Sequence, residues 1–243
     1  MKLLVDIGNS CLKAVVADGP RRMDTLRADG CGMETLGALL ERHPFVDRAI
    51  VCSTRADGHR AGEYLRGRLH KVVVLDHTTP VPIRNLYATP DTLGPDRLAA
   101  AVGAWRLFPG RASAVFDFGT ALTVDVVTAA GEFVGGNISA GLSLRCRALH
   151  EHTASLPLAE PGGDVPFLGT TTREALEAGA LWGMLYEVEG YIDRLRDLYG
   201  DMAIIFTGGD AGFFEKRLKN TIFANYEPVF VGLDTILDYN ADR

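Results

Sequence analysis

The sequence lacks a long apolar run and any long run of charge of one sign. Its 243 residues include 25 Lys and Arg against 31 Asp and Glu, which gives a net charge of −6. Because nucleic acid and anionic lipid attract clustered positive charge, this balance argues against both as partners. The first apolar run is broken at Asp6, too early for a signal peptide, so we expect a cytoplasmic protein.

Cysteine is scarce, and three common active-site motifs are missing. The four cysteines (Cys11, Cys31, Cys52 and Cys146) are scattered, without a C-x-x-C pair or a histidine at metal-ligand spacing, which favours reduced thiols over a metal site. The chain has no G-x-x-x-x-G-K-[ST], no G-x-G-x-x-G after a strand and no G-x-S-x-G. A P-loop enzyme, a dinucleotide-binding fold and a serine hydrolase are therefore unsupported.

The segments that are present alternate between strand and helix patterns, which indicates an α/β protein. Hydrophobic residues make up 47% of the chain, enough for one large domain or two small ones. We expect strands at 3–7, 11–17, 49–52, 72–75, 112–118, 122–127, 203–206 and 228–231. Helices are expected at 33–42, 61–69, from 95, 172–198 and from 233, with loops at 76–93 and 153–170 and a turn at Gly135-Gly136.

One strand–loop–strand pattern occurs twice. Asp6-Ile7-Gly8-Asn9-Ser10 and Asp117-Phe118-Gly119-Thr120-Ala121 both read Asp-x-Gly followed by a small polar residue, and they start 111 residues apart. Either copy alone is ordinary turn chemistry. Two copies predict two similar α/β halves, residues 1–111 and 112–243, each with such a hairpin.

The residue types in these hairpins suit phosphoryl transfer from ATP to a small hydroxyl compound. Glycine lets backbone N–H groups approach phosphate oxygens, and a carboxylate at a strand end binds Mg²⁺ directly or through water. Asp6 and Asp117 occupy such strand ends, and Lys13 is a candidate to neutralise the transferring phosphoryl group. The alternative for Lys13 is a solvated lysine on a hairpin.

Asp96 is the candidate general base. It follows a long loop and lies beside Arg97, where Gly94-Pro95 predicts the start of a helix. An acidic residue in a first helical turn is also favoured by the helix dipole, so a purely structural role stays open. Thr207-Gly208-Gly209 also has two possible roles. Its glycines could let an adenosine moiety lie against the backbone, or the segment is a plain strand-to-helix turn.

Taken in order, these motifs resemble the type III pantothenate kinases, over about residues 2 to 240. That family belongs to the superfamily of acetate and sugar kinases, heat-shock ATPases and actin, with two ribonuclease H-like halves that each carry a phosphate-binding β-hairpin. The matching motifs are residues 6–13, 117–125, Tyr87 with Gly94-Pro95-Asp96-Arg97, Gly135-Gly136-Asn137-Ile138 and Gly169-Thr170-Thr171-Thr172.

The resemblance implies ATP-dependent phosphorylation of pantothenate to 4'-phosphopantothenate, the first step of coenzyme A biosynthesis. It implies that Asp6, Ile7, Gly8, Asn9, Ser10, Cys11, Leu12, Lys13 and Thr120 contact ATP. It also implies that Tyr87, Gly94, Pro95, Asp96, Arg97 and Thr172 hold pantothenate, with Asp96 as the base. Magnesium near Asp6, potassium or ammonium at Asp117, and a homodimer with its substrate site at the subunit interface complete the expectation.

Three positions depart from the family pattern. Ser10 replaces a threonine and keeps its hydroxyl, whereas Leu122 replaces a threonine and loses one. Ala140 stands where proline is usual, which predicts a looser loop.

Two other functions remain as alternatives: a kinase of another small hydroxyl compound such as a sugar, and a nucleotide-binding regulator without catalysis.

Overall fold

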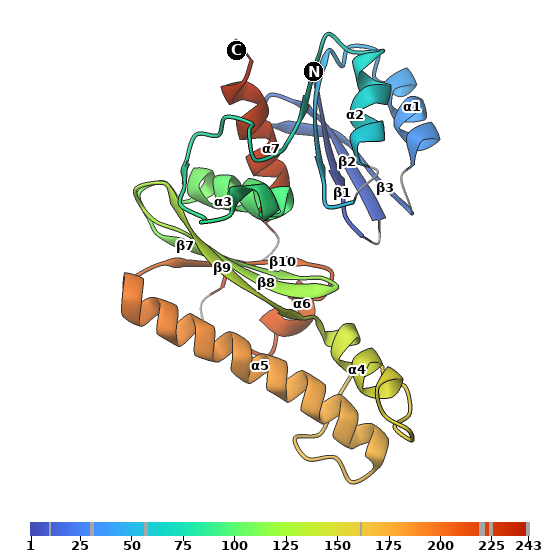
Figure 1. The fold of residues 1–243 in the computed structure, drawn as a ribbon, viewed down its shortest axis with the longest axis vertical. Coiled ribbons are helices and arrows are strands. Elements are labelled where there is room, and N and C mark those ends of the chain that lie inside the picture. The colour runs from blue at the N-terminus through green and yellow to red at the C-terminus, as the bar shows by residue number, and fades with distance from the viewer. Residues whose placement is uncertain are drawn as a thin grey trace. The chain divides into compact units, whose positions relative to one another are not determined.

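The computed structural model describes residues 1–9, 11–29, 32–55, 58–160, 162–218, 222–223 and 226–241. The chain forms two compact units (Figure 1). Unit 1 comprises Met1–Gly110, Val127–Gly135 and Glu227–Arg243, and unit 2 comprises Arg111–Val126 and Gly136–Tyr226. The division into repeated halves at residues 111 and 112 stays a prediction.

The sheet of unit 1 has the order β3-β2-β1-β4-β5. Strand β1 is antiparallel to β2 and parallel to β4. Leu3, Val5 and Ile7 pack with Leu36, Leu39 and Leu65 of the two helices on one face, and α7 contacts β1 and β4. The elements are β1 (Lys2–Ile7), β2 (Cys11–Asp18), β3 (Arg21–Asp29), α1 (Met33–Arg42), β4 (Arg48–Ser53), α2 (His59–Arg66), β5 (Lys71–Val74) and α7 (Pro228–Tyr239).

The second sheet has the order β10-β7-β8-β9-β6 and repeats this plan. Strand β7 is parallel to β10, as β1 is to β4, and β1 and β7 bury the same positions along their length. The predicted duplication is therefore confirmed. The elements are β6 (Arg84–Asn85), a 3₁₀ turn (Pro90–Thr92), β7 (Ser113–Phe118), β8 (Ala121–Val127), β9 (Glu132–Ala140), α4 (Leu142–Glu151), α5 (Thr172–Tyr199), β10 (Ala203–Gly208) and α6 (Ala211–Glu215).

Helix α3 (Pro95–Leu107) packs on α7 with almost no space between the backbones. A Cβ added to Gly103 would lie 1.8 Å from the carbonyl oxygen of Pro228, and one added to Gly232 would lie 1.8 Å from that of Ala99. Since no Cβ tolerates such distances, glycine is required at both positions. The contact holds the start of α3, which carries Asp96, against a rigid partner.

Two sequence predictions of local structure were wrong, and β3, β6, β9 and α4 were not predicted. Residues 228–231 form the first turn of α7 and not a strand, because Pro228 fits the first helical turn and Phe230, Leu233 and Ile236 share a buried face. Gly135 and Gly136 lie inside β9 and not in a turn. Strand β3 was missed because its exposed and half-buried residues include no apolar run.

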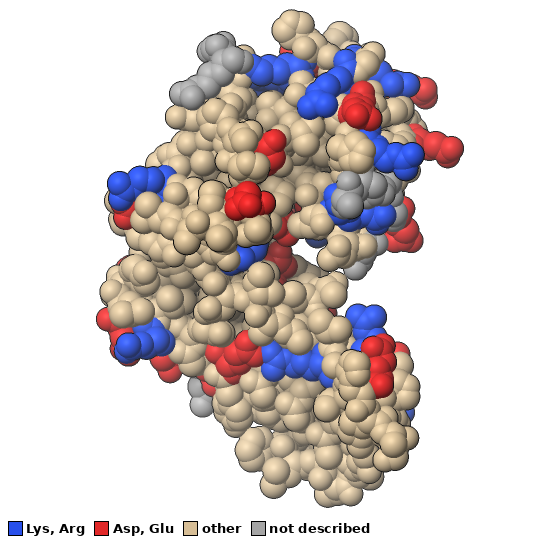
Figure 2. All heavy atoms as spheres, in the orientation of Figure 1, with Lys and Arg blue, Asp and Glu red and all other residues tan. Residues whose placement is uncertain are grey.

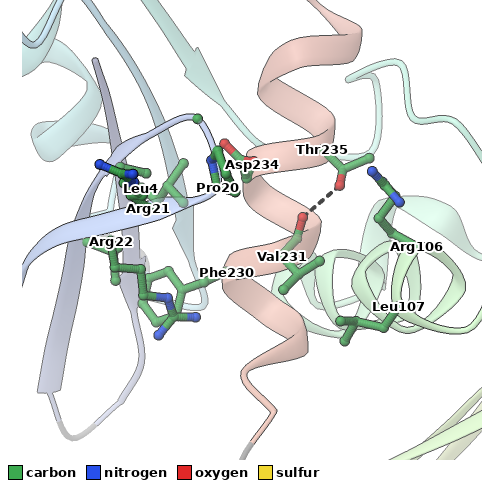
Figure 3. A pocket seen from close by; sticks show the side chains of 13 residues that line it. Leu4, Pro20, Arg21, Arg22, Arg106, Leu107, Phe230, Val231, Asp234 and Thr235 are labelled. Atoms are coloured by element: carbon green, nitrogen blue, oxygen red, sulfur yellow. Dashed lines mark hydrogen bonds between the residues drawn. The ribbon is translucent and has the colours of Figure 1, made fainter.

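Unit 1 contains a cavity of ≈270 Å³ between the β2–β3 turn, α3 and α7 (Figure 3). Its apolar wall includes Leu4, Val15 and Phe230, and its polar rim includes Arg21, Arg22 and Arg106. Figure 3 shows that Arg21 and Arg22 extend from β3 and Arg106 from α3, and that the three side chains do not converge on one point. No residue of the predicted active site lines this cavity.

The distribution of charge on the surface and the apolar character of the helices bear on the partners of the protein. On the face drawn in Figure 2, basic and acidic side chains are interspersed, without a large field of one sign. Among the described residues, no helix is both long and apolar enough to cross a membrane.

Candidate active site

The first hairpin places an acid and a base side by side. Asp6 of β1 and Lys13 of β2 are direct cross-strand partners, and both are half-buried. The turn between the strands is closed by the Gly8 N–H, which donates to the carbonyl oxygen of Cys11 at 3.0 Å. The side chains of Ile7 and Leu12 are fully buried, so only their backbone faces the loop. Ser10 lies outside the described residues.

Asp6 and Asp96 lie close to one thiol. Cys52 is the parallel-strand partner of Asp6 and is fully buried. Burial raises the pKa of the Cys52 thiol well above its ordinary value, and the nearby carboxylates of Asp6 and Asp96 raise it further. The end of β4 therefore brings together an acid from the phosphate hairpin and the acid at the start of α3.

The start of α3 sets the state of Asp96. Gly94 precedes the helix and Pro95 is its first residue. The Arg97 N–H donates to Oδ1 of Asp96 at 2.8 Å. Burial raises the pKa of Asp96, and this outweighs the lowering effect of the Arg97 N–H and charge. A carboxylate with a raised pKa is a better proton acceptor than an ordinary surface aspartate.

Arg97 is the cationic partner in this part of the site. It is buried, and its guanidinium lies 5.7 Å from the centre of the Tyr87 ring. The Tyr87 N–H donates to Oδ1 of Asn85 at 3.0 Å, and the ring of Phe133 lies 6.1 Å from that of Tyr87. A buried cation beside an aromatic ring suits the carboxylate and apolar body of a small organic acid. The structure thus brings together Asp6, Lys13, Asp96, Arg97 and Tyr87 within unit 1.

The second hairpin places Asp117 beside the end of β10. Asp117 pairs with Thr207, and a Cβ on Gly208 would lie 2.5 Å from Oδ1 of Asp117. Gly208 has φ +95°, a conformation that favours glycine. The start of the Thr207-Gly208-Gly209 segment therefore lies against the hairpin.

The two hairpins differ by one residue in length. The Gly119 N–H donates to the carbonyl oxygen of Ala121 at 3.0 Å, one residue earlier than the corresponding bond in the first hairpin. Thr120 is exposed at the tip, whereas Leu122 is buried. The leucine that replaces the family's threonine thus contributes to the core, and the tip keeps its hydroxyl.

Thr172 begins α5 in unit 2. Its neighbour Thr171 caps the helix: Oγ1 of Thr171 accepts a hydrogen bond from the Glu174 N–H at 3.2 Å, and the Glu174 carboxylate accepts one from the Thr171 N–H at 3.1 Å. The side chain of Thr171 therefore has a structural role in the cap of α5. Thr172 itself is exposed.

The carboxylates of the site suit a magnesium ion whose ligands are mainly phosphate oxygens of ATP. Among the described residues, no group of three or more His, Cys, Asp or Glu side chains gathers to hold an ion. Magnesium that accompanies ATP typically uses one or two protein carboxylates and phosphate oxygens. Asp6, at the end of β1 beside a glycine turn, is suited to that role.

Sequence reasoning missed three contributors to the site. Cys52 pairs with Asp6 and is affected by the charges of Asp6 and Asp96, and Arg145 and Glu187 hold the strand end that adjoins Thr120. Each depends on contacts between distant segments, so no local pattern pointed to them. The Thr171-x-x-Glu174 capping box was readable in the sequence and would have separated Thr171 from Thr172.

The repeated sheets with their Asp-x-Gly hairpins define a duplicated α/β fold. A solved structure described as a 2-dehydro-3-deoxygalactonokinase from Sinorhizobium meliloti is similar in fold, with a TM-score of 0.59, 14% identity and full coverage of both chains. A Campylobacter jejuni protein described as a Baf family transcriptional activator has a TM-score of 0.65 and 19% identity, over 99% of this chain and 100% of that one.

The sequence comparisons are more specific. The model of the type III pantothenate kinase family matches residues 2–194. A type III pantothenate kinase from Phocaeicola vulgatus is 40% identical over 240 residues, which cover 99% of each chain. The chain therefore belongs to the type III pantothenate kinase family, a family of small-molecule kinases.

Proposed function

We propose that the protein transfers the γ-phosphoryl group of ATP to the primary hydroxyl of pantothenate, giving 4'-phosphopantothenate and ADP for coenzyme A biosynthesis. The observation that carries the proposal is that Asp6 pairs with Cys52 of β4, while α3, which carries Asp96, contacts the same strand. This arrangement supports a phosphate-binding hairpin that acts together with a candidate base. Family membership supplies the substrate.

In this mechanism ATP occupies the hairpins. Residues 6–13 and Thr120 contact its phosphates, Asp6 helps to hold magnesium, and Lys13 balances charge on the transferring group. Magnesium supplies charge neutralisation between the phosphates. The opposed positions of Asp6 and Lys13 support this division of roles.

Pantothenate is held by Tyr87, Gly94, Pro95, Arg97 and Thr172. Its carboxylate pairs with the guanidinium of Arg97. Asp96 accepts the hydroxyl proton as the bond from that oxygen to the γ-phosphorus forms. The bond from the γ-phosphorus to the bridging oxygen breaks, and ADP leaves. The raised pKa of Asp96 supports its role as the base.

A monovalent cation, potassium or ammonium, completes the phosphate site at Asp117. Asp117 would hold such an ion, which would offset the negative charge that shifts toward the leaving oxygen in the transition state. The position of Asp117 beside Gly208, at the end of β10, supports this assignment.

The active protein is a homodimer that pairs through α5. The helix exposes Gly179, Gly183 and Gly190, and a Cβ at any of them would meet no atom within 4 Å. The exposed side chains of Phe167 and Tyr186 flank Trp182, with ring centres 5.5 Å and 6.4 Å from the Trp182 ring. In Figure 2 this end of unit 2 is largely uncharged. A second copy would cover this apolar surface.

Product analysis tests the proposal. Purified protein is incubated with ATP, magnesium, potassium and a panel of hydroxyl compounds that includes pantothenate and sugars, and the products are identified by mass spectrometry. We expect phosphopantothenate. Turnover of a sugar without turnover of pantothenate would favour the alternative kinase, and nucleotide binding without any product would favour a regulator.

Replacing Gly183 tests the dimer. Gly183→Trp is expected to give a folded monomer in sedimentation, with activity lost because the shared substrate site is broken. A wild-type monomer with full activity would refute the dimer.

A further inference from the structure

Three side chains from three elements of unit 2 form a polar cluster beside the second hairpin. Oγ of Ser139, in β9, donates to Oε1 of Glu187 in α5 at 2.5 Å. The guanidinium of Arg145, in α4, pairs with the other oxygen of Glu187, and its Nη2 lies 3.4 Å from Oγ of Ser139. Arg145 and Glu187 are each only 22% exposed, so both charges depend on this pairing.

The cluster also holds the backbone at the end of β9. Nε of Arg145 donates to the carbonyl oxygen of Ala140 at 2.8 Å. Ser139 and Ala140 are therefore fixed by a planar guanidinium that uses separate N–H groups for the carboxylate and for the backbone. Ala140 is also the position where the sequence predicts a loose loop, and the hydrogen bond from Arg145 restrains it.

The next residue transmits this restraint to the hairpin tip. The Gly141 N–H donates to the carbonyl oxygen of Thr120 at 3.0 Å. A Cβ on Gly141 would lie 2.2 Å from the carbonyl oxygen of Gly119 and 2.7 Å from that of Thr120. Because the two segments touch backbone to backbone, a shift of residues 139–141 must displace the hairpin tip.

We propose that Arg145 and Glu187 are positioning residues for ATP: they hold Ser139 and Ala140 so that Gly141 fixes Thr120 in its phosphate-binding position. The inference rests on the proposed use of Thr120 in ATP binding. Neither side chain touches the nucleotide in this scheme. Their effect passes through the backbone of residues 139–141.

Nucleotide binding without an acceptor tests the inference directly. The dissociation constant for ATP with magnesium is measured by calorimetry for wild type, Glu187→Ala, Arg145→Lys and Ser139→Ala, together with melting temperatures and the KM for each substrate. We expect Glu187→Ala to weaken ATP binding about 10- to 100-fold, the range caused by a displacement near 1 Å. The KM for pantothenate should stay within about 2-fold, because its proposed contacts lie elsewhere.

Two variants separate positioning from stability. Glu187→Gln keeps an acceptor for Ser139 and Arg145, so it should recover most of the ATP affinity lost in Glu187→Ala. Glu177→Ala is the matched control: Glu177 lies on the same helix, is 17% exposed and pairs with Arg173 at 3.1 Å. It should lower the melting temperature without changing ATP affinity.

Each outcome decides the question. Wild-type ATP affinity in folded Glu187→Ala would overturn the inference. Should Glu187→Ala fail to fold, Arg145→Lys and Ser139→Ala decide, and unchanged affinity in both would overturn it equally. If all variants bind ATP like the wild type but pantothenate is phosphorylated, only this inference falls. If the wild type binds no ATP, the inference and the proposed function fall together.

Discussion

Asp6 and Lys13 lie directly opposite each other across the β1–β2 hairpin. The hairpin thus places an acid and a cation on neighbouring strands, where the proposed mechanism uses Asp6 for magnesium and Lys13 for the transferring phosphoryl group. The second hairpin has no such lysine, because Thr123 occupies the position two residues after Ala121 in β8. The duplicated units thus share a backbone plan but have different charges.

Replacing the base should abolish turnover without unfolding the protein. Asp96→Asn keeps the size of the side chain and an oxygen that accepts from the Arg97 N–H, but it takes up no proton. We expect kcat to fall on the order of 10²–10⁴-fold, the usual contribution of general base catalysis. Steady-state kinetics and a melting curve on the same sample check this. A normal kcat would remove Asp96 from the mechanism and leave it a helix-start residue.

The same variant should be more stable than wild type at neutral pH. Burial raises the pKa of folded Asp96, so the folded state holds the proton more tightly than the unfolded state. The free energy of unfolding therefore decreases as pH rises from the unfolded pKa, about 3.9, through the folded pKa. Asp96→Asn removes this cost, so its advantage should grow over that range and then level off. Melting curves from pH 4 to 8 measure it, and a constant difference would contradict the assignment.

Substitutions at two adjacent threonines should have different effects, one on the stability of the protein and the other on substrate binding. Thr171→Ala removes the cap of α5 and should cost about 1 kcal/mol, or a fall in Tm of about 2–4 °C. Thr172→Ala should leave Tm nearly unchanged and raise the KM for pantothenate. Kinetics and calorimetry on both variants test the pair, and a reversal of the two effects would show that the roles have been exchanged.

The contact between α3 and α7 should tolerate no added methyl group. Gly103→Ala places a Cβ where Pro228 O lies 1.8 Å away, and we expect it to destabilise unit 1 by about 3 kcal/mol despite the better helix propensity of alanine. Gly212→Ala in α6 is the control, since its Cβ would meet no atom within 4 Å. Denaturant unfolding of both variants compares them, and equal stability would argue against a rigid contact.

Potassium or ammonium should activate the enzyme more than sodium does, through Asp117. The larger cations lose their water more readily and bridge a carboxylate to phosphate. Asp117→Asn is expected to remove the difference between the salts. Initial rates at constant ionic strength with each chloride salt measure the effect, and equal rates for wild type would end the proposal of a cation site.

Local patterns predicted most of the fold. The Asp-x-Gly repeat predicted two matched hairpins, and the segments at Met33–Arg42 and from Thr172 predicted α1 and α5 with nearly correct bounds. Strand β3 has no apolar period because it is largely exposed, and the first turn of α7 reads like a strand until its contact with α3 is known. These two segments have structures that depend on distant neighbours, and β9 and α4 were not predicted at all.

The sequence identified candidate residues for the site but not how these residues contact one another. Asp6, Lys13, Asp96 and Arg97 were all identified from their motifs. The position of Cys52 beside Asp6 comes from the parallel pairing of β1 with β4, and no spacing in the sequence encodes it. The contacts of Arg145 and Glu187 join residues 42 positions apart and were equally hidden.

The packing of α7 on α3 also has a consequence for biosynthesis. A ribosome adds roughly 5–20 residues per second, so α3 leaves the exit tunnel several seconds before α7 exists. During that interval the surface of α3 around Gly103 has no native partner, and the segment that bears Asp96 lacks its support. Unit 1 is thus completed only after the segment from Glu227 onward has been synthesised, and a chain whose synthesis stops before Pro228 should be recognised by chaperones and proteases as unfinished.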